Sequence, residues 1–371
     1  MKRSKPVVQQ DQMTLRVQEH IEAYQTKREK VANKIEVRNE TFMTQLGAFH
    51  LANPIPRALP YKGKKNKKTS RILNLMLSDL HYGANLVEAE TGNRYGALEE
   101  ARRTAAVVAQ TADHKRQYRD DTILYVHLLG DIIQGKLHDP ESAAPLTEQF
   151  ARASWYLRQA LRFLASEFKE VVVRCTPGNH GRRKDRHPDR AVNQKWDSIE
   201  GMLYVDLKMS LATIPNIRVE IPMKPYYIYE AFDRKGFMTH GDTVISVGYP
   251  GKAIPVESIR RQINEMNNKE HCHLYGAGHV HTSSKVRLPN GVVVVTNGCM
   301  IPSDDYAQSI GIMETSCSQQ LWESVPGYIF GDSRDILVDS TTDEDKSLDR
   351  IIKVFPGMPE FGRVAMEGDD E

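Results

Sequence analysis

The sequence predicts an α/β fold. From Arg71 onward, short apolar runs that read as buried strands alternate with longer amphipathic stretches that read as helices. The 371 residues are enough for one large domain or two ordinary ones, and the 40% hydrophobic and 26% charged content is typical of a globular protein. Polar segments stand at both ends of the alternating region. We therefore predict a main domain over residues 70–340 with an extension on either side.

The N-terminal segment, residues 1–52, is predicted to be a helical extension. Residues 11–48 contain no proline and are rich in Gln, Glu, Lys, Arg and Ala, a composition that favours helix. A narrow apolar stripe at helical spacing consists of Val17, Ile21, Tyr24, Val31 and Ile35. This helix could strap onto the main domain or form a coiled-coil homodimer. We favour the strap because the heptad pattern is not sustained.

A basic linker is predicted over residues 53–69, which contain three prolines and a cluster of lysines. The clustered lysines are Lys62, Lys64, Lys65, Lys67 and Lys68. We expect a solvated spacer here. The functional alternative is a mobile contact with a phosphate backbone.

Helices and strands follow in order through the main domain. Helices are expected over residues 98–117, 149–168 and 191–211. Strands without long helices between them are expected at 218–221, 226–232, 285–288 and 292–297. Trp155 and Tyr156 are expected to pack in the core. A last strand near 329–339 and a polar, acidic C-terminal tail over 341–371 complete the prediction.

Five segments of the main domain share one pattern, an apolar run that ends in a polar loop. The five loops contain, in chain order, Asp79-x-His81, Gly130-Asp131, Gly178-Asn179-His180, His240-Gly241-Asp242 and Gly278-His279-x-His281. In an extended chain, residues two apart point to the same side, so Asp79 and His81 could converge on one cation. Carboxylate, amide and imidazole groups are typical ligands of divalent metal ions.

The order and the residue types of these five motifs resemble the calcineurin-like metallophosphoesterases. The resemblance covers roughly residues 70–300, and the complete set is far more specific than any single motif. It implies a metallophosphoesterase-like four-layer sandwich of two mixed β-sheets flanked by helices, with a dinuclear metal centre that hydrolyses phosphoesters. A non-catalytic scaffold on the same fold would be indicated by lost ligands, and this set is complete. The long N-terminal helix and the His-Gly-Asp motif look like bacteriophage-encoded members.

The resemblance assigns seven metal ligands. Asp131, at a strand end after a glycine, is expected to bridge two ions. The remaining ligands are Asp79, His81 and His281 for one ion and Asn179, His240 and His279 for the other. Two divalent ions are expected, Mn²⁺ first, with Mg²⁺, Fe or Zn²⁺ as alternatives. Taken singly, Asn179 could cap a turn, His240 and Asp242 could hydrogen-bond each other, and the other histidines could lie on the surface.

His180 is expected to act on the substrate rather than to bind metal. In the family this position stabilises the transition state or protonates the leaving oxygen, and a metal-bridging hydroxide is the nucleophile. The double-strand-break repair nucleases of the family carry a histidine three residues after the bridging Asp, where this chain has Gln134. Hydrolysis should survive this change, whereas substrate and leaving-group handling could differ. His138 could substitute, although a solvent-exposed histidine is the simpler interpretation.

A basic run directly follows His180. Its expected substrate-binding side chains are Arg182, Arg183, Lys184 and Arg186. Beside a metal centre such residues would contact a polyanion, so we expect a nucleic acid substrate and a DNA exonuclease or endonuclease. The alternative for the run is a solvated loop. The second candidate function is a phosphatase or phosphodiesterase that acts on small molecules or phosphoproteins.

Overall charge and cysteine content give weaker information. Lys and Arg number 50 against 48 Asp and Glu, a net charge of +2, so any argument for nucleic acid must come from local charge. Four cysteines without a Cys-x-x-Cys motif indicate buried thiols in a reducing compartment. No apolar run has the length of a membrane span, and no apolar signal core follows the basic N-terminus. We expect a cytoplasmic location and no membrane partner.

Overall fold

The structure is a computed structural model. It describes residues 57–63, 69–87, 92–118, 121–136, 143–182, 195–248, 255–303, 317–338 and 344–355, with a few single positions besides. The chain divides into two compact units, Met1–Pro54 and Ile55–Glu371, which are described separately. The predicted strap or coiled coil lies almost wholly outside the described residues. Both β-sheets belong to the second unit.

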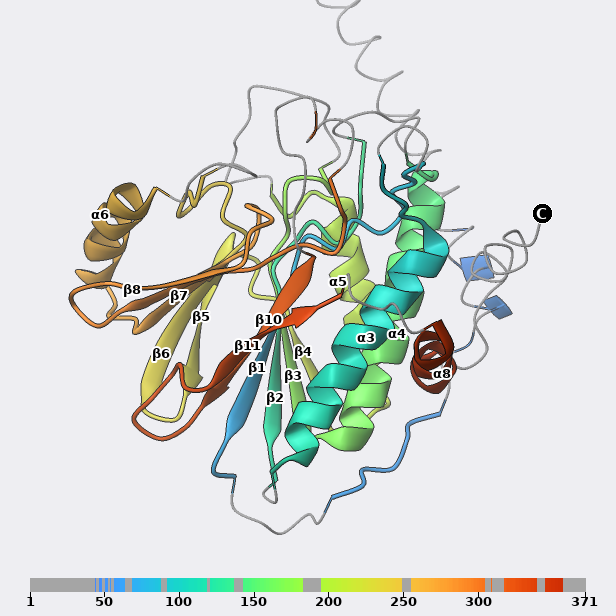
Figure 1. The fold of residues 1–371 in the computed structure, drawn as a ribbon, viewed down its shortest axis with the longest axis horizontal. Coiled ribbons are helices and arrows are strands. Elements are labelled where there is room, and N and C mark those ends of the chain that lie inside the picture. The colour runs from blue at the N-terminus through green and yellow to red at the C-terminus, as the bar shows by residue number, and fades with distance from the viewer. Residues whose placement is uncertain are drawn as a thin grey trace, which may run out of the picture. The chain divides into compact units, whose positions relative to one another are not determined.

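The first sheet has six strands in the order β11-β10-β1-β2-β3-β4 (Figure 1). Its strands are β1 Ile72–Leu77, β2 Ile123–Leu128, β3 Glu170–Cys175, β4 Ile217–Glu220, β10 Ser318–Ser324 and β11 Ser333–Leu337. The strands β1 to β4 run parallel, whereas β10 pairs antiparallel with both β1 and β11. β1 is buried along its whole length, which is why all of its residues except Asn74 are apolar.

The second sheet has five strands in the order β5-β6-β7-β9-β8. Its strands are β5 Tyr226–Ala231, β6 Arg234–Thr239, β7 Leu274–Ala277, β8 Ser284–Arg287 and β9 Val293–Thr296. β6, β7 and β9 run parallel, and β5 and β8 form antiparallel edges. Both sheets are therefore mixed, as predicted.

Helices cover the outer faces of the two sheets. They are α3 Ala97–Arg116, α4 Leu146–Glu167, α5 Ile199–Ser210, α6 Val256–Asn267 and α8 Glu344–Val354. Figure 1 shows α3, α4 and α5 beside the first sheet and α6 beside the second. One core cluster joins the sheets through residues such as Met76 and Tyr227. Another joins the second sheet to Ile259 and Ile263 of α6. The predicted four-layer α/β sandwich is confirmed.

The helix α6 corrects the expectation that no long helix separates the later strands. It lies between β6 and β7, and its buried residues are Ile259 and Ile263. A single pair of buried residues one turn apart is too narrow a stripe for the sequence to reveal. The third predicted helix is also shorter than expected, because α5 begins only after Ser198, whose Oγ accepts the N–H of Gly201 at 3.0 Å.

The C-terminal segment corrects a second expectation. Within the predicted polar tail, α8 buries Ile351 and Val354, and Phe355 directly after it is buried as well. The ring of Phe355 lies 5.4 Å from the rings of both Trp155 and Tyr156 on α4. The acidic composition of the segment conceals three apolar residues that pack on the first helical layer.

Part of the predicted linker is packed against the main domain. The N–H of Lys62 donates to Ser166 O at 3.0 Å, and its ammonium group is paired with Glu167. The hydroxyl of Tyr61 donates to Asp121 at 2.8 Å. Lys62 is therefore ion-paired with the main domain while its side chain stays 57% exposed. The other four clustered lysines lie outside the described residues.

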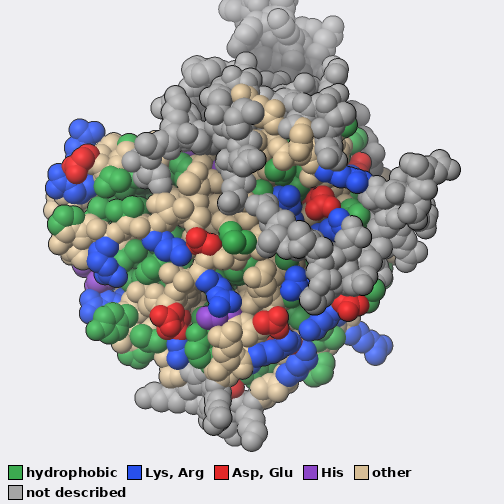
Figure 2. Space-filling model, in the orientation of Figure 1, with side chains coloured by type: hydrophobic (Ala, Val, Ile, Leu, Met, Phe, Trp, Pro, Cys, Tyr) green, Lys and Arg blue, Asp and Glu red, His purple; other side chains and the backbone are tan. Residues whose placement is uncertain are grey.

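The distribution of charged side chains on the surface is consistent with the net charge of +2. Basic and acidic side chains are interspersed among the coloured residues of Figure 2. Among the helices that the structure describes, none is both long and apolar enough to cross a membrane. The predicted buried thiols are confirmed, since all four cysteines are buried and free.

Candidate metal centre

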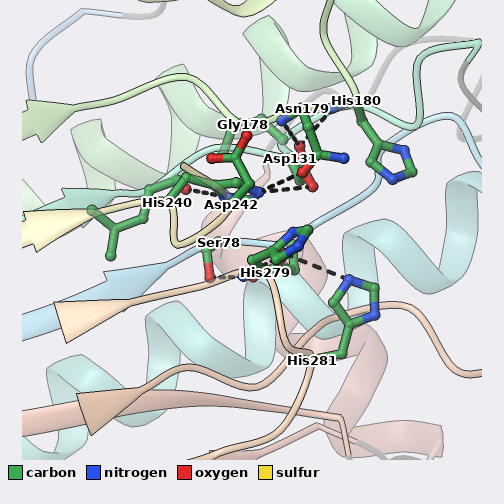
Figure 3. Close-up of polar contacts among 12 residues, drawn as sticks. Ser78, Asp131, Gly178, Asn179, His180, His240, Asp242, His279 and His281 are labelled. Carbon is green, nitrogen blue, oxygen red and sulfur yellow. Dashed lines mark hydrogen bonds and ion pairs between the residues drawn. The ribbon is translucent and has the colours of Figure 1, made fainter. Parts of the chain in front are cut away.

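The five predicted loops meet at one end of the two sheets. β1, β2 and β3 are parallel neighbours, so their C-terminal ends carry Asp79, Asp131 and Asn179 to the same edge. β6 and β7, parallel neighbours in the second sheet, carry His240 and His279 there. The N–H of His279 donates to the Asp79 carboxylate at 3.0 Å, which joins the two sheets directly. Figure 3 shows the side chains from both sheets around this point.

Backbone strain is concentrated at these loops. Seven described residues other than glycine have a positive φ, and five of them are predicted ligands. These five are Asp79 (φ 55°), His81 (φ 50°), Asp131 (φ 50°), His279 (φ 73°) and His281 (φ 56°). A left-handed backbone costs about 1–3 kcal/mol at such residues and persists only where the surrounding structure enforces it. The extended geometry predicted for Asp79 and His81 is therefore wrong, although their side chains do converge.

The first ligand group consists of Asp79, His81 and His281, whose ligand atoms all lie within 4.8 Å of one another. The Nε2 atoms of His81 and His281 are 3.3 Å apart. His281 Nε2 is also 3.5 Å from Asp79 Oδ1. Two imidazole nitrogens and a carboxylate oxygen that face one another in this way form a suitable donor set for a divalent cation.

The second group contains Asp131, His240 and His279, again with ligand atoms within 4.8 Å of one another. His240 Nε2 lies 3.1 Å from Asp131 Oδ2 and 3.0 Å from Asn179 Oδ1. The side-chain oxygen of Asn179 therefore faces this group and adds a neutral oxygen donor.

Asp131 of the second group also lies near His81 of the first, since His81, Asp131 and His180 form a third such group. Its carboxylate is held by hydrogen bonds. Its Oδ1 accepts the N–H groups of Asn179 at 2.7 Å and His180 at 2.8 Å. A Cβ at Gly178 would lie 2.0 Å from this oxygen, so only glycine fits there. Burial alone would raise the pKa of Asp131, but the neighbouring His240 and His180 hold it well below its usual value. The carboxylate is thus kept ionised where two cations could share it.

Hydrogen bonds fix the orientation of the imidazole rings. His240 Nδ1 lies 2.6 Å from Leu129 O, and His81 Nδ1 lies 2.8 Å from Gln134 Oε1. Both partners are acceptors, so Nδ1 of each ring carries a proton and Nε2 is directed toward the site. This arrangement is the usual way in which proteins prepare a histidine to bind metal.

The charges of the imidazoles follow from burial and from Asp131. Burial, reinforced by His180 and His281, lowers the pKa of His81 well below its usual value. Burial and then His240 lower the pKa of His279 to about 4. Burial would also lower the pKa of His240, but Asp131 outweighs it and raises that pKa to about 9. A bound cation would have to displace the His240 proton.

His180 lies at the border of the site, as Figure 3 shows. Its ring is 4.6 Å from the ring of His81, in an edge arrangement. His180 Nδ1 lies 2.8 Å from the main-chain oxygen of Gln134. Gln134 therefore contacts two predicted functional histidines, through its side chain and its backbone respectively. In the sequence, Gln134 stands out only as a departure from the repair nucleases of the family that the chain resembles.

The basic run is represented in the described residues by Arg182. Its guanidinium lies 3.1 Å from Asp242 Oδ2, and the ammonium group of Lys195 is paired with the other oxygen of Asp242. Asp242 thus pairs with two basic residues. The sequence alone is compatible with a simple hydrogen bond between His240 and Asp242, and these ion pairs are found instead. Arg183, Lys184 and Arg186, like His138, lie outside the described residues.

Three buried residues that the sequence did not single out hold the backbone of the loops. Glu100, at the start of α3, accepts the N–H of Gly83 at 2.6 Å. Gln149, near the start of α4, accepts the N–H of Gly135 at 2.7 Å. Glu200, at the start of α5, accepts one N–H group from the loop after β2 and one from the loop after β3. Acidic residues are common in the first turn of any helix, so the sequence carries no signal that Glu100 and Glu200 are buried.

The predicted ligands fit divalent cations. Each group is composed of oxygen and imidazole donors, and none includes a cysteine. The donors are mostly buried, and the hydrogen bonds at Nδ1 of His81 and His240 direct Nε2 of each ring toward the site. The fold and this cluster together define an α/β protein of two mixed sheets that carries His/Asp groups suited to metal.

No family model and no curated protein matches the chain. Similar solved structures include a hypothetical protein of Pyrococcus horikoshii, with 12% identity, a TM-score of 0.40, and coverage of 79% of this chain and 97% of that one. A predicted phosphoesterase of Streptococcus pneumoniae has 12% identity, a TM-score of 0.27, and coverage of 72% and 98%. A putative 5′-nucleotidase of Staphylococcus aureus has 12% identity, a TM-score of 0.32, and coverage of 77% and 58%. Phosphoesterase-type folds are thus among the neighbours, and at these low scores the site is judged from its own geometry.

Proposed function

We propose that the protein is a metal-dependent phosphoester hydrolase that uses two divalent ions, with Mn²⁺ as the first candidate. The observation that supports this proposal most strongly is the set of neighbouring ligand groups, in which Asp131 belongs to one group with His240 and His279 and to another with His81 and His180. When bound, the ions would polarise the phosphoryl oxygen and supply an activated water at neutral pH.

The chain itself supplies orientation and a proton. The rings of His81 and His240 are held with Nε2 available to the site, and two N–H groups fix Asp131. His180 is oriented by the contact of its Nδ1 with Gln134 O. Through its other nitrogen, His180 would carry a proton toward the leaving oxygen of the substrate, the task of a general acid.

As substrate we propose a nucleic acid, with DNA first. The support is the basic run that follows His180, of which Arg182 is close to the ligand His240 through their common neighbour Asp242. Arg183, Lys184 and Arg186 continue the run in the sequence. Basic side chains at this position would contact the phosphates on either side of the one that is cleaved. A small phosphodiester has no such flanking phosphates.

The test of the reaction is hydrolysis by purified protein after chelation and after the return of Mn²⁺. Labelled single- and double-stranded DNA and a small chromogenic diester serve as substrates. Activity should vanish with chelator, return with Mn²⁺, and be absent in Asp131→Asn. The matched control is Asp233→Asn, which changes an exposed carboxylate in the turn before β6 and should keep full activity. Chelator-resistant hydrolysis, or no hydrolysis with any metal, would refute the proposal.

The test of the substrate is replacement of Arg182, Arg183, Lys184 and Arg186 by Ser. Binding to DNA, measured with Ca²⁺ in place of Mn²⁺, should weaken and lose part of its salt dependence because fewer counterions are released. Hydrolysis of the small diester should barely change, since the ligands and His180 are intact. An unchanged salt dependence would favour the small-molecule phosphatase or phosphodiesterase instead.

A further inference from the structure

Glu200 is a completely buried carboxylate behind the candidate metal centre. It lies in the first turn of α5, and its relative exposure is 0%. Its Oε1 accepts the N–H of Ile132 at 2.5 Å, and its Oε2 accepts the N–H of Gly178 at 2.7 Å. One carboxylate therefore joins the loop after β2 to the loop after β3.

The two donors are next to predicted ligands. Ile132 follows Asp131, and Gly178 precedes Asn179. Asp131 joins the same two loops from within the site, through the N–H groups of Asn179 and His180. The loops are thus tied twice, once by a ligand and once by a residue that neither ligand group contains.

Only a carboxylate of this length satisfies both loops. The two partners are N–H donors, so the side chain must offer two acceptors, and an amide would set its NH₂ group against one of them. Aspartate is one methylene shorter and cannot span the same pair without a shift of α5. The space is also closely packed, because a Cβ at Gly181 would lie 2.7 Å from Glu200 Cγ.

Burying the Glu200 carboxyl away from water is unfavourable unless hydrogen bonds compensate for the lost hydration. Burial, and next the charge of Asp131, raise the pKa of Glu200 to about 7. A buried carboxyl is tolerated when its hydrogen bonds are made, and here both oxygens are used on backbone groups of the site. The arrangement stabilises the relative position of two loops.

We propose that Glu200 is a positioning residue that sets the separation of Asp131 from Asn179 and so controls occupancy of the Asn179–His240–His279 position. The proposal rests on the two-ion site proposed above. The Asp79–His81–His281 position shares Asp131 but takes its other ligands from the loops after β1 and β7, so it should be affected less.

The test is a titration of the apo-protein with Mn²⁺, followed by electron paramagnetic resonance, in wild type, Glu200→Gln, Glu200→Asp and Leu207→Ala. Leu207 is a buried residue on the same helix. Leu207→Ala is therefore the control for a variant that loses stability without losing a contact to the loops. Wild type and Leu207→Ala should give the exchange-coupled signal of an ion pair. In both Glu200 variants the second ion should bind about 10–100-fold more weakly and leave the signal of a single ion.

Each outcome separates this proposal from the one on which it rests. A wild type that never binds two ions refutes the metal centre and Glu200 together. A coupled signal of unchanged affinity in folded Glu200→Gln refutes only the role of Glu200. Equal loss in Leu207→Ala, or failure of both Glu200 variants to fold, would make Glu200 a residue of general stability and overturn the proposal.

Discussion

Gln134 contacts both a predicted metal ligand, His81, and the predicted general acid, His180. Its side-chain oxygen accepts from His81 Nδ1, and its main-chain oxygen lies against His180 Nδ1. The first contact belongs to the side chain and can be removed by mutation, whereas the second belongs to the backbone and cannot. A residue in this place can therefore tune metal binding without acting on the substrate.

Gln134→Ala should lower the affinity for Mn²⁺ about 10–100-fold, because the ring of His81 loses the acceptor that fixes its orientation. Gln134→Glu keeps an oxygen acceptor and should bind Mn²⁺ nearly as wild type does. Isothermal titration calorimetry of the three proteins measures the difference. Equal affinities in wild type and Gln134→Ala would show that the contact has no positioning role.

His180 and Asp131 should separate proton transfer from metal binding. His180→Ala should retain both ions and lose about 10²–10⁴-fold in kcat, the range of a missing general acid. Asp131→Ala should lose both metal and activity, because in the proposed centre this carboxylate is shared by the two ions. Metal content and turnover are measured on the same samples. If His180→Ala lost its metal as completely as Asp131→Ala, the division of roles would be wrong.

At the scale of the elements, α8 is held to the first helical layer by few residues. Phe355 is buried against Trp155 and Tyr156, whereas Ile352 on the same helix is 67% exposed. Phe355→Ala should lower the free energy of unfolding by about 3–5 kcal/mol. Ile352→Ala is the matched control and should stay within about 0.5 kcal/mol of wild type. Similar effects of the two changes in chemical denaturation would mean that α8 does not pack as described.

The two sheets meet at a buried histidine. His127 of β2 contacts the Tyr227 hydroxyl of β5 through Nδ1 at 2.8 Å and Asn74 Oδ1 of β1 through Nε2 at 3.2 Å. Its ring is stacked on Trp322 of β10, with centroids 5.7 Å apart. Burial, and next the charge of Arg174, lower the pKa of His127 well below its usual value.

This histidine should make the packing of the sheets sensitive to acid. Below about pH 6.5 His127 is protonated in the unfolded chain but stays neutral in the folded one. The free energy of unfolding therefore decreases as the pH is lowered, by at most about 1.4 kcal/mol per pH unit. His127→Gln lacks this group and should show a flatter dependence between about pH 5 and 6.5. The other buried histidines are common to both proteins and cancel in the comparison. Parallel dependences would contradict the neutral, buried state of His127.

At the scale of the whole molecule, the sequence predicted the features that depend on neighbouring residues in the chain and missed those that depend on contacts formed by folding. The α/β pattern and the five loops could be predicted because each ligand type follows its own strand directly. Glu200 and Gln149 could not, because their importance depends on which loop a helix start meets after folding. The left-handed backbone of the ligands was also hidden, since neighbouring loops enforce it. The cytoplasmic location, the bacteriophage origin and the N-terminal homodimer stay predictions.

The central claim is that loops from both sheets form one centre for two metal ions. The measurement that tests it most directly is anomalous diffraction at the manganese edge from crystals grown with Mn²⁺. Two peaks are expected, one among Asp79, His81 and His281 and one among Asn179, His240 and His279, with Asp131 in contact with both. A single peak, or peaks away from these residues, would contradict the account.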